Sequence, residues 1–481
     1  MTGLLVFFLC AALLVAGYFI YGHLAERVYG LPHEMEMPCV AHPDGVDFVP
    51  LPTWKIFLIQ LLNIAGLGPV VGAVSGCLFG PAALLWIVIG CIFAGAMHDF
   101  LAARMSADAD GANLPELVGE NLGRPASHAM RTVCVGLLLL VGVVFTLLPA
   151  GMLHGICPGV SEFAWSTIII TYYFLATILP INVIIGRIYP IFGALFLFMA
   201  AGLGIMLPVG GYEVLPCLDF FTNMHPAGQQ IWPALFVTIA CGAISGFHAT
   251  QSPMMVRCLP DAFHMRRVFY GAMIVEGMVA LVWATVGLTL RDMLVATPDG
   301  GEALFYTLKP AVAVTAACNL LLGHKCALFA VLGVVVLAVS SGDTAMRSCR
   351  LMLSDLLHLE QRVLWKRLAL ALPIFTTVII LSNVDFSIVW RYFGWANQAL
   401  SCITLWSITV CLRRRGRFYW IALLPALFMT TMCTTFLLAA PECGIELPTQ
   451  TATYIGLGFT TLLCSLFALL AKSRKHNAGE D

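Results

Sequence analysis

Apolar runs of about 20 residues recur along almost the whole chain, and a helix needs a run of about this length to cross the hydrocarbon core of a bilayer. Charged residues make up only 11% of the 481 residues, whereas a soluble protein carries about 25%. The sequence therefore predicts an all-α polytopic membrane protein whose outer surface mostly faces lipid rather than water.

The length criterion predicts about 13 transmembrane helices. They lie near residues 3–21, 55–75, 81–104, 132–152, 164–181, 188–208, 232–251, 269–289, 326–345, 366–383, 389–411, 419–439 and 451–471. The first run, GLLVFFLCAALLVAGYFIYG, lacks the basic start and the small-residue cleavage site of a secretory signal peptide. We therefore expect this run to remain in the protein as a helix.

Basic residues are concentrated in alternate loops. If the N-terminus lies outside, the cytoplasmic loops include VRCLPDAFHMRRV, MRSCRLMLSDLLHLEQRVLWKR, LRRRGR and AKSRKH, while the opposite loops GGYEVLPCLDFFTNMHPAGQQ and PECGIELPTQ contain no Lys or Arg. The exceptions are Arg291, Lys309, Lys325 and Arg391. Short cytoplasmic loops carry an excess of Lys and Arg, so we expect the N-terminus outside and the C-terminus inside. Residues 303–322 are less apolar and are expected to form an external or partly inserted helix.

Two of the predicted spans contain residues that interrupt helices. The second span reads LLNIAGLGPVVGAVSG and the seventh reads TIACGAISGFHATQSP. Non-helical backbone is tolerated at membrane depth only where it lines a cavity or is buried in protein. Interrupted segments at matching positions of two oppositely oriented halves indicate the substrate site of a transporter. The residues of this predicted substrate site are Gly66, Gly68, Pro69, Ser245, Gly246, His248 and Gln251.

The matching positions of the two interruptions predict a 5+5 inverted repeat within one transmembrane domain, residues 1–481. Its halves are residues 55–208 and 232–411, flanked by a peripheral helix and cytoplasmic loop (1–54) and by two C-terminal helices with a tail (412–481). An alternative interpretation accounts for the second span alone. Gly68, Gly72 and Gly76 follow an i, i+4, i+8 pattern, which is typical of close helix packing.

A possible cation site lies near the interruption of the second span. Hydroxyl groups at the end of the ninth span, facing carbonyls freed by that interruption, would form an all-oxygen site suited to Na⁺. Its candidate residues are Ala65, Ser340, Ser341 and Thr344. Alternatively, these hydroxyls bond back to carbonyls of their own helix. Two polar residues of the eleventh span, Asn397 and Gln398, are expected to tie helices together rather than to touch substrate.

Ionisable residues inside membrane spans are costly and indicate function by default. We interpret His98, Asp99, His248 and Glu276 as a proton relay, because histidine titrates near neutral pH. His98 and Asp99 are adjacent, so their side chains point about 100° apart on a helix and do not both face one ligand. Asp343 is a further candidate in the same half of the membrane.

Local ion pairs are the alternative explanation for some of these residues. Asp343 and Arg347 are four residues apart and are expected to pair within one helix if they have no functional role. Asp99 and Arg104 form a second possible interfacial pair. Glu276 is flanked by apolar residues, which favours a functional role over a structural one.

The 17 cysteines show no C-x-x-C pair and no metal-ligand spacing, so we expect them to be packing residues and expect no metal or cofactor. Motifs of a membrane-embedded enzyme, such as H-E-x-x-H, are not found, and neither is a filter-like repeat of a channel. A sensor without transport activity is a further alternative, but it would be expected to carry a soluble output domain. The pattern favours a transporter over all three.

Five sequence motifs resemble the carbon starvation protein A family. They are IAGLGPVVGAV, LLWIVIGCIFAGAMHDF, FVTIACGAISGFHATQ, SSGDTAMRSCRLML and FGWANQAL, in the family's order, over residues 50–410. The resemblance implies peptide or pyruvate transport across the bacterial inner membrane, coupled to protons. It also implies the amino acid–polyamine–cation (leucine-transporter-like) fold and marks Gly66–Pro69, His98–Asp99, Ser245–His248 and Ser341–Thr344 as family signature positions.

We therefore expect a secondary active transporter, not an enzyme, that takes up small peptides with protons during carbon starvation. The alternative substrate is pyruvate, and the alternative coupling ion is Na⁺. The expected partners are a small-molecule or peptide substrate and the lipid bilayer, and nucleic acid is not among them. The sequence leaves the oligomeric state open.

Overall fold

A computed structural model describes residues 2–30, 35–179, 181–226, 228–291, 310–440 and 445–477, and the regular elements in these ranges are all helical. The first half contains α1 (Thr2–Tyr29), α2 (Pro38–Ala41), α3 (Thr53–Ala65), η1 (Gly68–Gly72), α4 (Ala73–Gly76), η2 (Cys77–Phe79), α5 (Ala82–Gly90), η3 (Cys91–Gly95), α6 (Ala96–Asp108), α7 (Leu114–Leu122), α8 (Arg124–Ile156), α9 (Glu162–Ile178) and α10 (Ile181–Val209). The second half contains α11 (Ile231–Thr238), α12 (Gly246–Val256), η4 (Ala262–His264), η5 (Arg266–Tyr270), α13 (Gly271–Thr289), α15 (Pro310–Leu356), α16 (Leu364–Leu381), α17 (Phe386–Arg414), α18 (Trp420–Ala439) and α19 (Thr449–Asn477).

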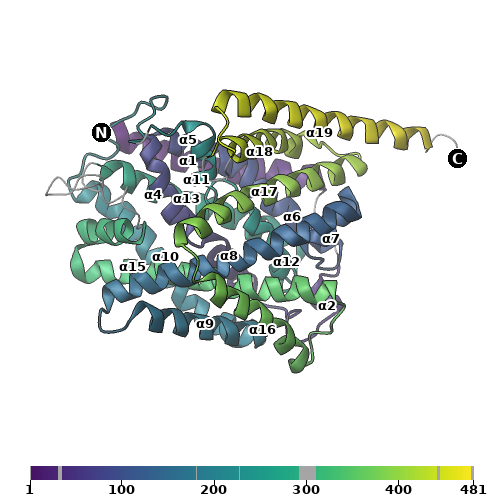
Figure 1. The fold of residues 1–481 in the computed structure, drawn as a ribbon, viewed down its shortest axis with the longest axis horizontal. Helices are drawn as coiled ribbons and strands as arrows, with labels where there is room; N and C mark the ends of the chain where they lie inside the picture. The colour runs from purple at the N-terminus through teal and green to yellow at the C-terminus, as the bar shows by residue number, and fades with distance from the viewer. Residues whose placement is uncertain are drawn as a thin grey trace.

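The helices form a bundle in which the long helices α8 and α15 pack against each other (Figure 1). The C-terminal helices α18 and α19 lie together along one edge, and α9 and α16 lie together at the opposite edge. Among the described residues, nine helices are long and apolar enough to cross a membrane, or ten if the bent pair Thr53–Ala65 and Gly68–Phe79 counts as one span. The protein is therefore a multi-pass membrane protein, while the count of 13 spans and the orientation of the termini stay predictions.

Besides the bent pair in the second span, two of the expected spans differ from a simple membrane helix. The span expected near 164–181 forms the shorter helix α9, and the span expected near 232–251 is divided between α11 and α12. The segment expected over 303–322 begins outside the described residues, but from Pro310 onward it is helical and belongs to α15. Gly323 marks a kink in α15, with a φ of 69°. The non-helical backbone of Gly323 therefore separates this segment from the rest of α15, which contains the ninth predicted span.

Both predicted interruptions are present in the structure. The first break, residues 66–67, follows α3, and the chain bends by 50° before continuing from Gly68. Gly66 has a φ of 41°, which a residue with a side chain rarely adopts. The second break, residues 239–245, separates α11 from α12, and Gly242 has a φ of 90°. Glycine thus permits the backbone to leave the helical conformation at both breaks.

The two breaks pack directly against each other through the glycine pattern of the second span. A Cβ atom added to Gly68 would lie 2.1 Å from Cβ of Cys241, and one added to Gly72 would lie 2.9 Å from the carbonyl oxygen of Thr238. Gly76 makes a similarly close approach to Ile239. The glycines of the second span therefore do pack closely, as the alternative interpretation expects. The segment against which they pack is the second break, which is part of the predicted substrate site.

A buried ion-pair cluster holds the end of α15. Asp47 lies between α2 and α3 and is 1% exposed; its Oδ1 is 2.9 Å from Nη1 of Arg347, and its Oδ2 is 3.1 Å from Nη2 of Arg350. Arg347 also donates to the carbonyl oxygen of Leu179 at 2.7 Å. The predicted intrahelical pair of Asp343 with Arg347 is therefore wrong. The long guanidinium side chain reaches Asp47, which would otherwise be a buried carboxylate without a counter-charge.

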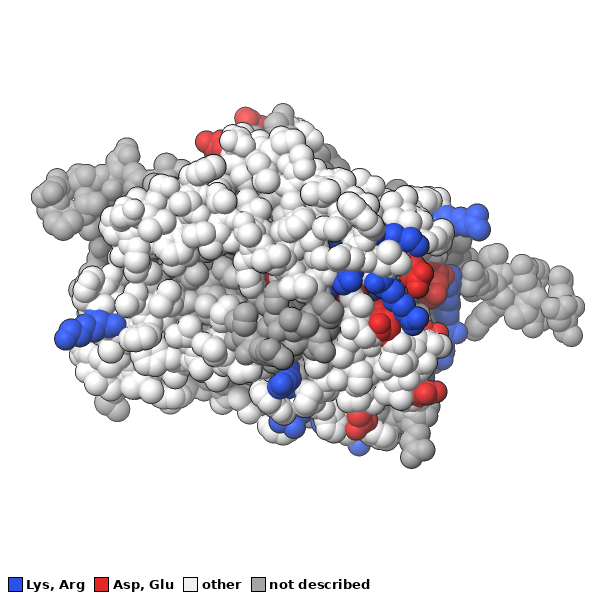
Figure 2. Space-filling view, turned by 90° about the horizontal axis from the view of Figure 1, so that it is seen from below, with Lys and Arg blue, Asp and Glu red and all other residues white. Residues whose placement is uncertain are grey.

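Charged side chains elsewhere gather toward one end of the face shown in Figure 2, most of which is uncharged. This distribution agrees with a protein whose middle zone contacts hydrocarbon, because charges are costly there.

The first prediction concerns Asp47→Asn, which leaves two buried arginines without their carboxylate. We expect a loss of about 3–5 kcal/mol in the free energy of unfolding, seen as a lower thermal unfolding temperature in detergent. Asp110→Asn is the matched control, because Asp110 is exposed and its φ of 51° also suits asparagine. An unfolding temperature equal to that of the control would contradict the structural role of the cluster.

The same variant has an expected pH dependence. Burial alone would raise the pKa of Asp47, but the guanidinium groups of Arg350 and Arg347 lower it to about 2. Because the folded-state pKa lies below the unfolded one, the stabilisation is complete above about pH 4 and is lost as the pH falls through about 2. The stability difference between wild type and Asp47→Asn should therefore be constant from about pH 8 to pH 5 and shrink below about pH 4.

The second prediction concerns Gly68→Ala, which places a methyl group against Cys241 in the contact between the breaks. Overpacking of a tight core site costs about 1–3 kcal/mol, so the thermal unfolding temperature should fall. Gly458→Ala is the control, because Gly458 is exposed in α19 with nothing within 4 Å of an added Cβ. That control should be neutral or slightly stabilising, and equal effects of the two changes would argue against the close packing.

Candidate functional site

All residues predicted to form the substrate, proton and cation sites are buried around the two breaks. They are Ala65, Gly66, Gly68, Pro69, His98, Asp99, Ser245, Gly246, His248, Gln251, Glu276, Ser340, Ser341 and Thr344. The structure divides the polar ones into two sets. One is the His–Asp–Glu cluster, defined as His98, Asp99, His248 and Glu276. The other is the hydroxyl group set, defined as Ser340, Ser341 and Thr344.

The His–Asp–Glu cluster joins three helices through the carboxylate of Asp99 and the imidazole of His248. Asp99 Oδ2 lies 2.9 Å from Nδ1 of His248, and Asp99 Oδ1 lies 2.8 Å from Nδ1 of His98. On the far side of its ring, His248 Nε2 lies 3.5 Å from Oε2 of Glu276. His98 and Asp99 come from α6, His248 from α12 and Glu276 from α13. The predicted relay residues are thus in contact, in the order His98, Asp99, His248, Glu276.

The second break positions this cluster. His248 lies in the first turn of α12, which begins immediately after the break. The end of η3, which continues directly into α6, approaches the break closely, because a Cβ atom added to Gly95 would lie 2.2 Å from the carbonyl oxygen of Ala243. This approach places Asp99, one turn further along α6, beside His248. The sequence therefore assembles the cluster by packing a glycine of one helix onto the unwound backbone of another.

Four atoms in the cluster are buried without a hydrogen-bond partner. They are Nε2 of His98, Nε2 of His248 and both carboxylate oxygens of Glu276. An unpaired buried polar atom costs about 1–3 kcal/mol, and such atoms are often explained by function. The cluster can accept a proton or bind a cation between Nε2 of His248 and Oε2 of Glu276, which lie 3.5 Å apart.

The side chain of Asn397 bridges α17 to the second break. Its Oδ1 accepts hydrogen bonds from Oγ of Ser245 at 3.0 Å and from the amide of Phe247 at 2.8 Å. Gln398 donates through Nε2 to the carbonyl oxygen of Phe236 at 2.9 Å. Both residues connect α17 to the α11–α12 region, which agrees with the expectation that they tie helices together.

Gln251, a predicted substrate-site residue, lies apart from these contacts. Its Nε2 donates to Oγ1 of Thr250 at 2.9 Å, while its Oε1 is buried without a partner. The structure places it in α12, one turn beyond His248, and gives it no hydrogen bond to the His–Asp–Glu cluster within the described residues.

The hydroxyl group set faces the last turns of α3. Ser341 Oγ donates to the carbonyl oxygen of Leu62 at 2.9 Å, and Ser340 Oγ reaches the same oxygen at 3.2 Å. Thr344 instead bonds to carbonyls of its own helix, at 3.1 Å and 3.2 Å. Both sequence interpretations are therefore represented. The serines reach the segment before the first break, while Thr344 bonds back to α15, as Ser340 also does through the carbonyl oxygen of Leu337 at 3.0 Å.

Sequence reasoning missed the environment of Asp343. Its Oδ2 accepts a hydrogen bond from Tyr172 at 2.6 Å and its Oδ1 accepts one from Tyr189 at 2.9 Å. Asn63 is a further neighbour, 3.3 Å from the Tyr189 hydroxyl. Asp343 thus belongs beside the hydroxyl group set rather than with the histidines. Tyrosines inside apolar spans were the available signal, because a buried tyrosine hydroxyl usually finds a polar partner.

The predicted pair of Asp99 with Arg104 is also wrong. The guanidinium carbon of Arg104 lies 5.2 Å from the ring centroid of Tyr29, and its Nη1 is 3.8 Å from the sulfur of Met265. Five residues correspond to a rotation of about 140° around a helix. Arg104 therefore points away from Asp99, whose two oxygens are already occupied by the histidines.

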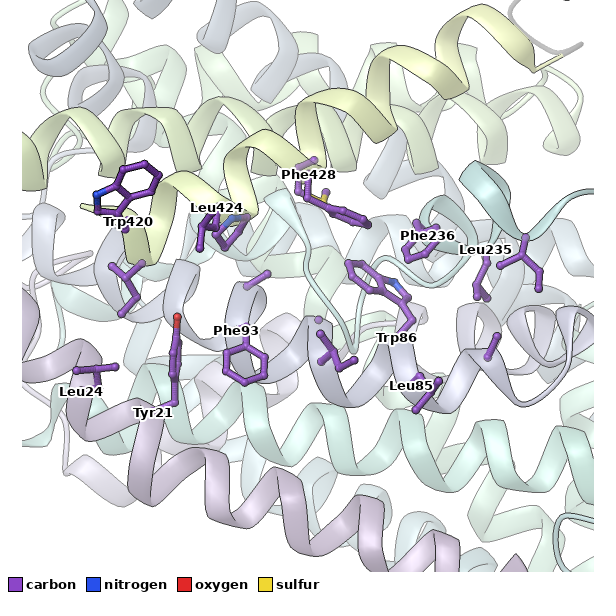
Figure 3. A pocket seen from close by; sticks show the side chains of 18 of the residues that line it. Tyr21, Leu24, Leu85, Trp86, Phe93, Leu235, Phe236, Trp420, Leu424 and Phe428 are labelled. Atoms are coloured by element: carbon purple, nitrogen blue, oxygen red, sulfur yellow. The ribbon is translucent and has the colours of Figure 1, made fainter. Parts of the chain in front are cut away.

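One apolar pocket is lined by none of these residues. It has a volume of about 570 Å³ and is lined by side chains of α1, α5, η3, α11 and α18, including Trp86, Phe93 and Phe428 (Figure 3). Its lining is almost entirely apolar, so it offers few groups for recognising a polar solute. Ionisable side chains gather instead in the buried His–Asp–Glu cluster.

Comparison with known families decides the classification of this arrangement. The family model described as "Carbon starvation protein CstA" matches residues 2–162, 157–297 and 321–436. The chain belongs to this family. The matched segments of this CstA-family protein contain both breaks, the His–Asp–Glu cluster and the hydroxyl group set.

Individual relatives include transporters. An uncharacterized membrane protein of Haemophilus influenzae is 42% identical over 348 residues, which cover 62% of this chain and 94% of that protein. The peptide transporter CstA of Campylobacter jejuni is 24% identical over 86% of this chain and 76% of its own length. The pyruvate/proton symporter BtsT of Escherichia coli is 28% identical over 54% of this chain and 45% of its own length. Two of these relatives of the CstA-family protein are thus named as transporters.

Solved structures agree on the fold. MhsT in complex with L-phenylalanine has a TM-score of 0.57 and 13% identity, covering 85% of this chain and 98% of that chain. A manganese transporter of Eremococcus coleocola has a TM-score of 0.52 and 13% identity, covering 90% of this chain and 99% of that chain. Both belong to the leucine-transporter fold, so the all-helical CstA-family protein resembles that fold.

The third prediction concerns Asn397→Ala. This change leaves the Ser245 hydroxyl and the Phe247 amide as buried donors without their acceptor, at a cost of about 1–3 kcal/mol for each. We expect a lower thermal unfolding temperature in detergent. Asn319→Ala is the control, because Asn319 is exposed and bonds only within its own helix, to Thr315. If both variants unfold at the wild-type temperature, Asn397 does not secure the second break.

Proposed function

We propose that this CstA-family protein is a secondary active transporter that takes up small peptides together with protons across the bacterial inner membrane during carbon starvation. The observation that carries the proposal is that His248 is buried between Asp99 and Glu276 and contacts both, so that the three residues connect three helices. Ionisable groups inside a membrane protein mark ion or proton pathways, and these three meet at the unwound backbone of the second break.

Proton coupling is supported by the placement of His248 between two carboxylates. A protonated imidazole in this position has a carboxylate on each side, at Nδ1 and at Nε2. Loss of the proton removes the positive charge that separates the two carboxylates. The stability of the contact between α6, α12 and α13 therefore depends on whether His248 is protonated. A histidine is suited to this exchange near neutral pH.

Substrate binding is proposed at the breaks, where new helical segments begin at Gly68 and Gly246. The N-terminus of a helix carries a partial positive charge and amide donors, which favour a carboxylate. A peptide presents such a carboxylate at its C-terminus. The peptide transporter CstA of Campylobacter jejuni aligns over 86% of this chain, compared with 54% for BtsT, and this difference favours a peptide as the substrate.

Pyruvate is the second candidate. It carries the same carboxylate group, and the relative BtsT is a pyruvate/proton symporter. The proposed transport cycle is the same for either substrate: one bundle of helices rocks against another around the buried breaks and exposes the site alternately to the two sides.

The fourth prediction is tested in proteoliposomes loaded with a pH-sensitive dye. A small peptide and pyruvate are offered separately, each with and without a Na⁺ gradient. We expect peptide-dependent internal acidification without Na⁺ in the wild type. His248→Gln should reduce it by about 100-fold or more, because the proton-exchanging group is lost. His264→Gln is the matched control, because His264 is 41% exposed and lies outside the cluster.

Other outcomes of this experiment would contradict specific parts of the proposal. Internal acidification in the pyruvate runs but not in the peptide runs would show that pyruvate, and not a peptide, is the substrate. Uptake that requires Na⁺ and leaves the dye unchanged would move the coupling site to the hydroxyl group set beside Leu62. Uptake of neither compound, by protein whose elution in size-exclusion chromatography shows it to be folded, would remove both substrate assignments.

A further inference from the structure

We infer that Cys241, His248 and Glu276 form a binding site for a divalent metal ion of the zinc class. One potential ligand atom from each residue (Sγ of Cys241, a ring nitrogen of His248 and a carboxylate oxygen of Glu276) lies within 4.8 Å of the others, and all three residues are buried. Cys241 belongs to the second break, His248 to α12 and Glu276 to α13. The site is therefore assembled from three segments that have no metal-binding spacing along the chain.

The distances suit a tetrahedral ion. Zinc binds nitrogen and oxygen ligands at about 2.0–2.2 Å, so two such ligands of one tetrahedral ion lie about 3.4 Å apart. Nε2 of His248 and Oε2 of Glu276 are 3.5 Å apart. An ion between them needs little movement of either side chain. Cys241 then supplies the third ligand within the same small volume.

The other face of His248 supports the same conclusion. A metal-binding histidine almost always gives its second ring nitrogen to a carboxylate or carbonyl, which fixes the ring orientation. His248 meets this condition, because its Nδ1 lies 2.9 Å from Oδ2 of Asp99, and Asp99 is held in turn by His98. This arrangement directs Nε2 toward Glu276 and Cys241.

The prospective ligand atoms of His248 and Glu276 are also available, while Sγ of Cys241 makes two long contacts that a bound ion would replace. These contacts are 3.5 Å to Oγ of Ser245 and 3.8 Å to Nδ2 of Asn397. Nε2 of His248 and both oxygens of Glu276 have no hydrogen-bond partner, so a bound ion would satisfy buried polar atoms without breaking hydrogen bonds at them. The cysteine is free of any disulfide. Metal binding is expected to displace the proton of its thiol, because the thiolate is the ligand form.

The type of ligand selects the ion. A thiolate and an imidazole favour Zn²⁺ or Co²⁺ over Mg²⁺, Ca²⁺ and Mn²⁺, which prefer oxygen ligands. Three protein ligands leave a fourth position for water or solute, as in zinc sites that are not purely structural. The manganese transporter shares only the fold with this chain. The ligands of the metal site are therefore assigned from Cys241, His248 and Glu276 alone.

Occupancy by zinc has a functional consequence that rests on the proposed proton coupling. The ion would occupy Nε2 of His248 and the carboxylate of Glu276, so these groups could not exchange a proton. It would also join the second break to α12 and α13 and hold these segments together. We therefore expect micromolar Zn²⁺ to inhibit proton-coupled uptake of the substrate.

The fifth prediction tests metal binding separately from transport. The purified full chain in detergent is titrated with Co²⁺, and the thiolate-to-cobalt charge-transfer band is recorded in the near ultraviolet. We expect one Zn²⁺-displaceable band that is absent from Cys241→Ser and retained in Cys349→Ser, a buried cysteine of α15 outside the site. Asp99→Asn should bind about 10–100-fold more weakly, because it loses the carboxylate that orients His248.

The two proposals fail in different ways. A cobalt band that is the same in wild type and Cys241→Ser, with both proteins monodisperse in size-exclusion chromatography, would overturn the metal site whatever the protein transports. If Cys241→Ser does not fold, Glu276→Gln takes its place, and unchanged Co²⁺ affinity in that variant would also overturn the site. A Cys241-dependent band in protein that takes up neither peptide nor pyruvate would support the metal site and contradict only the proposed substrate. Where uptake is measured, Zn²⁺ should inhibit the wild type at least about 10-fold more strongly than Cys241→Ser.

Discussion

The two breaks depend on each other, because backbone polar groups inside a bilayer must be satisfied within the protein. The glycine face that begins at Gly68 packs onto the unwound residues around Cys241. Asn397 then supplies the acceptor for the amide of Phe247, where the second helix resumes. Neither interruption is isolated in hydrocarbon, and the burial that makes both tolerable also brings α6, α12 and α13 to one point.

The sequence predicted the parts of this arrangement that depend on composition and local pattern. Apolar run lengths indicated a helical membrane protein, glycine and proline indicated the two interruptions, and rare ionisable residues indicated His248 and Glu276. It could not predict partners that are distant along the chain. Arg347 was expected to pair within its own helix, but its length allows it to reach Asp47, 300 residues away. The approach of Cys241 to two relay residues was equally hidden, because spacing along one segment does not reveal ligands from three.

The buried polar groups form two separate chemical environments. The His–Asp–Glu cluster combines imidazoles with carboxylates, which suits protons or a borderline metal ion. The hydroxyl group set presents oxygen atoms to the end of α3, which suits a hard cation. Asp343 adds a carboxylate to the second environment through Tyr172 and Tyr189. The two environments therefore differ in the kind of ion that their atoms would favour.

The length of α15 has a mechanical consequence. Ser341 contacts Leu62 in α3, and nine residues later Arg350 contacts Asp47 in the segment that leads into the same helix. Nine residues of helix span about 13 Å, so α15 is attached to the α3 segment at two points well separated along its axis. Two such attachments prevent rotation as well as sliding. The N-terminal part of the first interrupted span and α15 are thus expected to move as one rigid body, and any hinge must lie beyond Ala65, where the backbone has already left the helix.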